Sequence, residues 1–338
     1  MLPARLRFHS EKDREIATRD PGVGNLGGDE AAGSGSGLKL QDYLVLLLLA
    51  AIWGASFLFI KVAVGEMTPF VLVFGRCLSA AIGLAVALRV SHVPWSVVRR
   101  HWRGGVAIGL FNAAIPYVLI SFGEQYIDSS LAGILNATAP LWTMLLAPFW
   151  AEADHLGPKQ VGGLVLGFLG VVVLARPTGN ILSSGTLGIL AVVVATLCYG
   201  WATHFSRRAF QRTPPQVPAF LQCALAALFL APLAAWTWPA TVPSPQAIAA
   251  VLWLGLGATG LAMVLSYYLI KRVGASRTIV VTYLIPPFAL VWGVGILHEH
   301  IGVETGVALL LILGGVFLIT RPSGGRAARL VEETAPET

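Results

Sequence analysis

The sequence predicts an all-α integral membrane protein in which ten transmembrane helices form two inverted five-helix repeats. Three observations lead to this fold class: the composition, the lengths of the apolar stretches, and a similarity between the two halves of the chain. Of the 338 residues, 56% are hydrophobic and only 12% are charged, whereas soluble domains carry about 25% charged residues. The composition therefore disfavours a soluble enzyme, a nucleic-acid-binding protein and a disordered protein.

Ten apolar stretches alternate with short polar connections. Each has the length, about 20 residues, with which a helix crosses about 30 Å of hydrocarbon. None shows the alternation of apolar and polar residues that a transmembrane barrel requires. The predicted spans are 42–65, 68–90, 103–123, 128–150, 158–176, 186–208, 216–238, 246–270, 275–297 and 301–320. Residues 1–41, which contain no signal-peptide apolar core, and residues 323–338 are predicted to be flexible cytoplasmic tails.

The basic residues predict the orientation of the chain in the membrane. Twenty of the 23 Lys and Arg residues fall in the two tails and in the connections on the same side. The opposite side has only Arg176, while Lys61 and Arg76 lie within spans. Basic residues concentrate on the cytoplasmic side of membrane proteins. We therefore expect a multi-pass protein of the plasma (inner) membrane with both termini in the cytoplasm.

The second half of the sequence repeats the first with a shift of 146 residues. Gly54 falls on Gly200, Lys61 on Arg207 and Pro140 on Pro286, among other Gly, Pro and charged matches. The predicted repeats are residues 42–179 and 186–322. Because each contains five spans, an odd number, the second repeat must enter the membrane from the opposite side. Inverted repeats are typical of secondary transporters, which bind their substrate between the two halves.

Several stretches carry a family resemblance. In the first half they are IWGASFLFIKVAV, AGILNATAPLWTMLLA and GPKQVGGLVLGFLGVVVL, and in the second CYGWATHFSRRAF, TIVVTYLIPPFALVWGV and GVETGVALLLILGGVFLI. They resemble the EamA-type repeat of the drug/metabolite transporter superfamily over about residues 42–322. The resemblance implies a ten-helix exporter or importer of small metabolites, often amino acids or related compounds. Two positions depart from the first repeat's pattern: Gln222 stands where Arg76 does, and Tyr199 stands for Trp53.

Three prolines suggest where a substrate binds. Proline removes the hydrogen bond to the carbonyl four residues earlier, so Pro116, Pro140 and Pro286 free the carbonyls of Asn112, Asn136 and Thr282. Each of these polar residues either satisfies its own loosened helix or lines a shared polar cavity. The expected substrate-binding residues, with His204 and three aromatic side chains that would attract an ammonium group, are Asn112, Asn136, His204, Thr282, Trp53, Tyr199 and Trp201. We expect a zwitterionic or amphipathic metabolite there.

The charged residues leave the energy coupling open. Arg76 lies deep in the second span, where it either binds a substrate carboxylate or fastens helices through backbone carbonyls, and the second role is favoured. For Lys61, near a span end, extension of the side chain to the membrane surface is favoured. The acidic residues map to span ends or connections, so a mid-membrane carboxylate relay is not indicated. Facilitated diffusion and coupling through His204 or Glu124 both remain open.

The function predicted is that of a secondary transporter that exports a small metabolite by alternating access. No phosphate-binding loop or hydrolase motif is present, and His298-Glu299-His300 is interpreted as an interfacial polar turn, so no catalytic residue, cofactor or metal is expected. The alternative is a membrane-embedded enzyme acting on a lipid-linked substrate. The expected partners are the lipid bilayer and a small-molecule substrate, without nucleic acid. Glycine pairs such as Gly163 and Gly167 indicate packing within the bundle, with a homodimer interface as the alternative.

Overall fold

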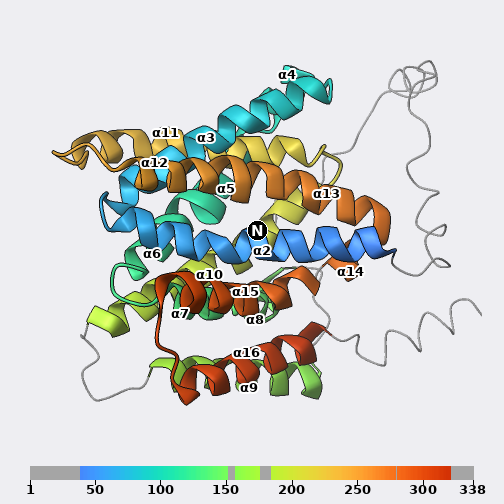
Figure 1. Ribbon diagram of the computed structural model, residues 1–338. Helices are drawn as coiled ribbons and strands as arrows, with labels where there is room; N and C mark the ends of the chain where they lie inside the picture. Colours follow the sequence, from blue (N-terminus) through green and yellow to red (C-terminus); the bar gives the residue numbers. More distant parts are fainter. Residues whose placement is uncertain (1–38, 151–156, 176–183, 279, 321–338) are drawn as a thin grey trace, which may run out of the picture.

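The structure is a computed structural model that describes residues 39–150, 157–175, 184–278 and 280–320 (Figure 1). Within these ranges every regular element is helical, and ten helical segments are long and apolar enough to cross a membrane. The predicted spans and fold class are confirmed. Of the predicted tails, residues 1–38 and 323–338 lie outside the described residues, while α2 begins at Leu40.

Seven of the ten spans are single α-helices, and the other three change geometry along their length. The uninterrupted helices are α2 (Leu40–Val64), α3 (Pro69–Val90), α9 (Pro158–Ala175), α10 (Ser184–Ala209), α11 (Gln216–Trp236), α15 (Val280–Leu297) and α16 (Val303–Thr320), of which α11 and α15 contain internal prolines. The composite spans are α5 (Trp102–Gly109), η3 (Leu110–Ala114) and α6 (Ile115–Gly123); α7 (Ser129–Asn136), α8 (Ala139–Leu146) and η4 (Ala147–Phe149); and α12 (Pro245–Leu252), η5 (Trp253–Leu261) and α13 (Ala262–Val273). Two short helices, α4 (Trp95–Arg100) and α14 (Ala275–Thr278), lie in connections.

The irregular segments have identifiable local causes. Pro116 follows the π-helix η3, where the wider turn accommodates the ring. Pro140 stands in the first turn of α8, where a proline is tolerated, and the helix is broken before it, after Asn136. The π-helix η5 contains no proline. There the Thr259 hydroxyl donates to the carbonyl of Leu254 at 2.9 Å, which inserts a side chain into the helical hydrogen-bond ladder.

The two halves interlock through equivalent contacts. A Cβ placed on Gly54 of α2 would lie 2.7 Å from the Cβ of Phe288 on α15. A Cβ placed on Gly200 of α10 would lie 2.8 Å from the Cβ of Trp142 on α8. Gly54 and Gly200 are repeat mates, as are Trp142 and Phe288 under the 146-residue shift. The first helix of each repeat therefore packs closely on the fourth span of the other, as inverted repeats require.

A second pair of contacts follows the same symmetry. Gly255 of η5 faces the backbone of Arg76 and Ala80 on α3. Its repeat mate Gly109 faces Gln222 and Ala226 on α11, which are the mates of those two residues. The third span of each repeat therefore lies against the second span of the other repeat.

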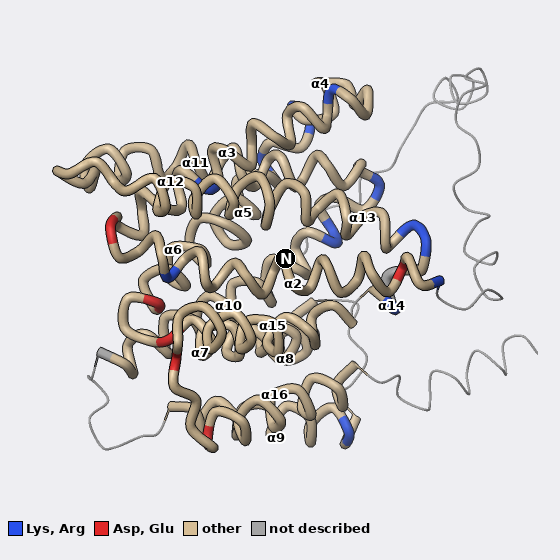
Figure 2. The backbone as a smooth tube through the Cα atoms, viewed as in Figure 1, with Lys and Arg blue, Asp and Glu red and all other residues tan. Residues whose placement is uncertain are grey.

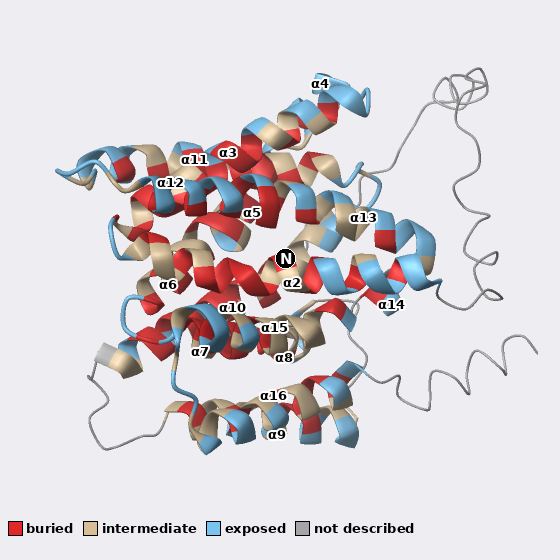
Figure 3. Cartoon of the chain, in the orientation of Figure 1, coloured by how far each residue is buried: buried red, intermediate tan, exposed pale blue. Residues whose placement is uncertain are grey.

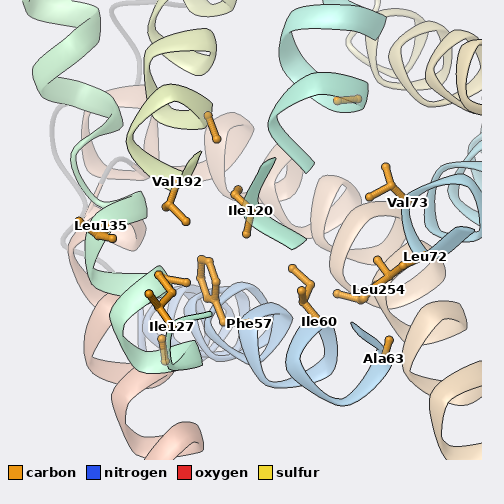
Figure 4. Close-up of a cluster of buried hydrophobic side chains, with 14 of the residues drawn as sticks. Phe57, Ile60, Ala63, Leu72, Val73, Ile120, Ile127, Leu135, Val192 and Leu254 are labelled. Atoms are coloured by element: carbon orange, nitrogen blue, oxygen red, sulfur yellow. The ribbon is translucent and has the colours of Figure 1, made fainter. Parts of the chain in front are cut away.

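The core and the surface are both apolar. One buried cluster brings together side chains of α2, α3, α6, α7, α10 and η5, among them Phe57, Ile60, Leu72, Ile120 and Leu254 (Figure 4). Large apolar side chains are also exposed along the outer helix faces (Figure 3), for example Ile82, Val165 and Leu310. A soluble monomer rarely exposes such an extended apolar surface, and hydrocarbon is the environment that suits it.

Most acidic residues of the described chain lie at one end of the bundle and most basic residues lie at the other (Figure 2), with Asp42 and Lys61 as exceptions. We call the end that carries Glu66, Glu124, Asp128, Glu299 and Glu304 the acidic end, and the opposite end the basic end. At the basic end, Asp42 of α2 accepts a hydrogen bond at 2.7 Å from Nε of Arg272 on α13 and forms an ion pair with it. This pair joins the start of the first span to the end of the eighth. The fifth spans, α9 and α16, lie against each other as a separate layer (Figure 1).

Candidate functional site

A buried guanidinium group stands between the two halves. Arg76 of α3 is 7% exposed, and its guanidinium carbon lies 3.9 Å from the ring centroid of Tyr117 on α6. Its Nε donates to the hydroxyl of Thr259 on η5 at 3.4 Å, a long hydrogen bond. Among the described residues Arg76 forms no ion pair, and no bond to a backbone carbonyl is found, which differs from the helix-fastening role that the sequence favoured. A buried cation with so few partners is suited to an anionic ligand.

Two of the predicted substrate residues lie on the elements around Arg76. Asn112 of η3 donates through Nδ2 to Oε1 of Gln222 at 2.6 Å, and Gln222 is the repeat mate of Arg76. The ring of Tyr199 on α10 lies edge-on to Tyr117, with 6.5 Å between the centroids. Asn112 and Tyr199 thus lie on elements, η3 and α10, that pack against each other between the two repeats.

Trp53, a third predicted residue, joins the halves next to this group. Its indole Nε1 donates to the carbonyl of Ala258 at 3.1 Å, one residue before Thr259. This carbonyl belongs to the π-helix η5, whose irregular hydrogen bonding leaves carbonyls to be satisfied by side chains.

His204 and Trp201 belong to an aromatic group nearer the basic end. A ring nitrogen of His204 lies 2.8 Å from the carbonyl oxygen of Thr143 on α8, and the ring stacks on Trp150. Trp201 contacts both Trp150 and Phe111, with centroid distances of 6.2 Å and 4.8 Å. Because Phe111 precedes Asn112 in the chain, this aromatic group continues from the Arg76 region towards the basic end.

The break in the fourth span has unsatisfied polar atoms on both sides. Oδ1 of Asn136, at the end of α7, is buried and has no hydrogen-bond partner among the described residues. The same holds for the indole Nε1 of Trp142 on α8. Buried polar groups without partners are rare in folded proteins, so an acceptor and a donor that flank one helix break indicate a place for a ligand or water. Thr282, the repeat mate of Asn136, lies on α15.

A second polar group, at the acidic end, was not identified as a site by the sequence. Lys61, for which extension to the membrane surface was favoured, reaches the connection between two spans. Its ammonium group donates to the carbonyls of Glu124 at 2.7 Å and Ile127 at 2.8 Å, which lie just after α6. A pocket of about 400 Å³ lies beside this group, lined by Lys61, Asp128, Leu297, His298, Glu299 and His300.

Glu299 caps a helix of the other repeat. Its carboxylate accepts the backbone N–H groups of Ser129 at 2.7 Å and Ser130 at 3.0 Å, at the first turn of α7, and also the Ser130 hydroxyl. Burial works to raise the pKa of Glu299, but these hydrogen bonds outweigh it and hold the pKa below its usual range. The repeat pairs Ser130 with Ser276 and Glu299 with Asp154 were the signals that could have indicated this contact. Asp154 lies outside the described residues.

Comparison with known proteins decides the family. The EamA-like transporter family matches residues 41–176 and 186–321. The chain belongs to this family. It is 24% identical to an uncharacterized transporter of Archaeoglobus fulgidus, over 83% of this chain and 99% of the relative. It is 27% identical to a protein of Streptantibioticus cattleyicolor described as a probable terminal-alkyne amino-acid exporter, over 86% of this chain and 97% of that protein.

Two further comparisons, one with a sequence relative and one with a solved structure, agree with this family. It is 24% identical to the uncharacterized inner membrane transporter YedA of Escherichia coli K12, over 81% of this chain and 89% of YedA. A crystal structure with a TM-score of 0.60 and 21% identity covers 83% of this chain and 97% of the other. The resemblance to the EamA-type repeat that the sequence suggested is therefore confirmed, and the protein is a multi-pass membrane transporter.

Proposed function

We propose that this EamA-like transporter exports a small zwitterionic or amphipathic metabolite, such as an amino acid, by alternating access between its two repeats. The observation that carries the proposal is Arg76, a buried cation between the halves that has a long hydrogen bond and an aromatic face but no carboxylate partner. A substrate carboxylate would supply the missing counter-charge. The similarity to an amino-acid exporter supports the same class of substrate.

The predicted substrate residues fit this assignment. Tyr199 and Trp53 offer aromatic faces for a substrate ammonium group, an attraction of about 0.5–2 kcal/mol. Asn112 and Asn136 offer amide groups, and the break after Asn136 allows part of the fourth span to bend. We propose that His204, Trp201 and Thr282 complete the lining of the path. Because the two repeats are inverted copies, the molecule can open at either end by equivalent movements of one repeat against the other, as alternating access requires.

We further propose that the basic end faces the cytoplasm and the acidic end faces outward in the plasma (inner) membrane. The asymmetry of Lys and Arg supports this orientation. The similarity to an inner membrane transporter supports the location.

Exchange across vesicles tests the function. Purified protein in proteoliposomes loaded with one unlabelled amino acid is given the same amino acid radiolabelled outside, across a panel of neutral, acidic and basic amino acids. We expect counterflow of at least one neutral amino acid. A wild-type protein that exchanges none of them, but turns over a lipid-linked substrate, would contradict the exporter.

Substitution of Arg76 tests the site. Because a hydrogen bond to a charged group contributes about 1.5–3 kcal/mol, Arg76→Gln is expected to lower counterflow at least about tenfold, while Arg76→Lys lowers it less. Arg89→Gln, at an exposed position near the end of the same helix, is the matched control and should exchange like the wild type. Unchanged counterflow in Arg76→Gln would exclude a carboxylate contact there.

A further inference from the structure

One carboxyl group at the acidic end is fully buried and has no hydrogen-bond partner in the described part of the chain. The side chain of Glu124, in the turn between α6 and α7, is 0% exposed. Neither carboxylate oxygen has a hydrogen-bond partner among the described residues. An ionised carboxylate in such a place loses its hydration without compensation, so the neutral, protonated form is strongly favoured.

The charged groups around Glu124 do not reverse this preference. Lys61 of α2 is the cation with the largest effect on Glu124, but its ammonium group is held by two backbone carbonyls and not by the carboxylate. Burial raises the pKa of Glu124 well above its usual range and Glu299 adds to the rise, whereas Lys61 and Arg76 lower the pKa by less. Asp128 stands at the end of the same turn, and His300 acts on Asp128 from the connection before α16. The segment of α10 that packs on Gly123, from Gly188 to Val192, contains no titratable residue.

A contact between the two repeats lies next to the turn that holds Glu124. Glu299, in the connection between α15 and α16, is tied to the first turn of α7 through Ser129 and Ser130. We call this contact the acidic-end latch. It joins the two repeats across the turn that holds Glu124. Lys61, which donates to two backbone carbonyls of that turn, also lines the pocket of about 400 Å³ with Asp128 and Glu299. The pocket therefore lies beside the turn that holds Glu124.

The backbone beside the latch is shaped for this contact. His298 has a positive φ of 56°, which a residue with a Cβ adopts only at some cost. This turn brings the Glu299 N–H back to the carbonyl of Gly293 at 3.1 Å. A Cβ on Gly293 would collide with the Ser130 hydroxyl and the Glu299 carboxylate. A strained turn and a residue without a side chain thus both place Glu299 on α7.

We propose that Glu124 is a proton-binding site that gates the acidic end of the transporter. It holds one proton while the acidic-end latch is closed, and it gives that proton to water in the pocket when the latch opens. The reverse transfer, from hydronium to the carboxylate, accompanies closure. Opening is therefore favoured as the pH at the acidic end rises. The proposal rests on the transport function proposed above, and it assigns a regulatory ion to it.

Infrared difference spectroscopy tests the proton site without any substrate. The full-length protein in lipid nanodiscs is titrated from acidic to alkaline pH, and the C=O band of a protonated carboxylic acid is followed. We expect a band that persists near neutral pH in the wild type and is lost in Glu124→Gln. Glu66→Gln is the matched control. It removes a carboxylate at the same end that is bound by Ser244, and it should leave the band unchanged. An identical band in the wild type and Glu124→Gln would overturn the proton site.

Spin labels test the gate. Nitroxides are placed at Gln125→Cys and Val303→Cys, both exposed and on the two sides of the latch, and their distance distribution is measured across the same pH range. We expect a longer distance to gain population as pH rises in the wild type, a fixed short distance in Glu124→Gln, and a longer distance already near neutral pH in Glu299→Gln. A wild-type distribution that does not respond to pH would overturn the gate.

The infrared and spin-label measurements distinguish a failure of the proton gate from a failure of the proposed transport function. Both work on the protein without substrate, so they can fail while amino-acid counterflow persists. Counterflow can likewise fail while the band and the distances behave as expected. If Glu124→Gln is obtained only as unfolded protein, Glu124→Asp serves instead, with a shifted titration of the same band as the expected result and an unshifted one as the contradiction.

Discussion

At the scale of single residues, the polar groups of the bundle differ in how well they are satisfied. Asn112 and Gln222 form a close pair, whereas Oδ1 of Asn136 has no partner in the described part of the chain. The net contribution of a hydrogen bond to stability is about 0.5–1.5 kcal/mol, and a buried group that loses its partner costs about 1–3 kcal/mol. The two asparagines should therefore respond differently to the same substitution.

We expect Asn136→Ala to lower counterflow with a thermal stability close to that of the wild type, because no hydrogen bond of its side-chain oxygen is lost. Asn112→Ala should lower counterflow and also destabilise the fold by about 1–3 kcal/mol, because Gln222 is left without its donor. Thermal unfolding in detergent, read beside counterflow, checks both. Wild-type exchange in the double variant would show that neither asparagine contacts the substrate.

The hydrogen-bond partners of individual side chains are also what the sequence analysis predicted least well. Hydropathy identified Lys61 and Glu299 as residues near span ends, but it did not identify their binding partners. Lys61 binds carbonyls that are 63 and 66 residues away in the sequence, and Glu299 binds a helix turn about 170 residues away. Such contacts depend on how the spans are arranged. Asn112 and Tyr199 could be proposed from the sequence because a proline four residues later and a repeat position, respectively, mark them locally.

At the scale of elements, the span positions followed from the sequence because a helix that crosses hydrocarbon must present an apolar run of fixed length. Irregular helical segments could be predicted from the sequence only where a proline lies beside them. The π-helix before Pro116 and the break before Pro140 stand beside predicted kinks. The longer π-helix from Trp253 to Leu261 depends on one threonine hydroxyl and several glycines, a combination with no single sequence marker.

The close approach of α2 to α15 gives a prediction at this scale. Gly54→Ala would bring a Cβ within 3.1 Å of the Phe288 side chain and of the backbone at Ala289 and Ile285, so the helices must separate. Overpacking of this kind costs about 1–3 kcal/mol, and a lower unfolding temperature is expected.

The matched control for Gly54→Ala is Gly162→Ala, where a Cβ on α9 would meet nothing within 4 Å. Alanine is the better helix former by about 0.5–1 kcal/mol, so stability should hold or rise. If the two variants unfold at the same temperature, the close contact between the repeats does not limit stability.

At the scale of the whole molecule, the separation of charge predicts which end of the bundle faces the cytoplasm, and cysteine labelling tests this orientation. A single cysteine is introduced at Thr241, in the connection between α11 and α12 at the acidic end, or at Ser91, in the connection after α3 at the basic end. Both positions are exposed, and the native cysteines are buried. In intact cells a membrane-impermeant maleimide should label Thr241→Cys and spare Ser91→Cys. The opposite pattern would reverse the orientation, and with it the direction of transport.

The interlocking of the repeats also has a consequence for how the protein is made. The ribosome delivers α2 to the membrane long before α15, yet α2 buries its Gly54 face on α15, and Asp42 near its start pairs with Arg272, 230 residues later. The first five spans therefore enter the bilayer with part of their final interface still facing lipid or the insertion machinery. Assembly of this transporter is complete only when the last helices arrive, so a nascent chain that stalls halfway exposes the surfaces that quality-control proteases recognise.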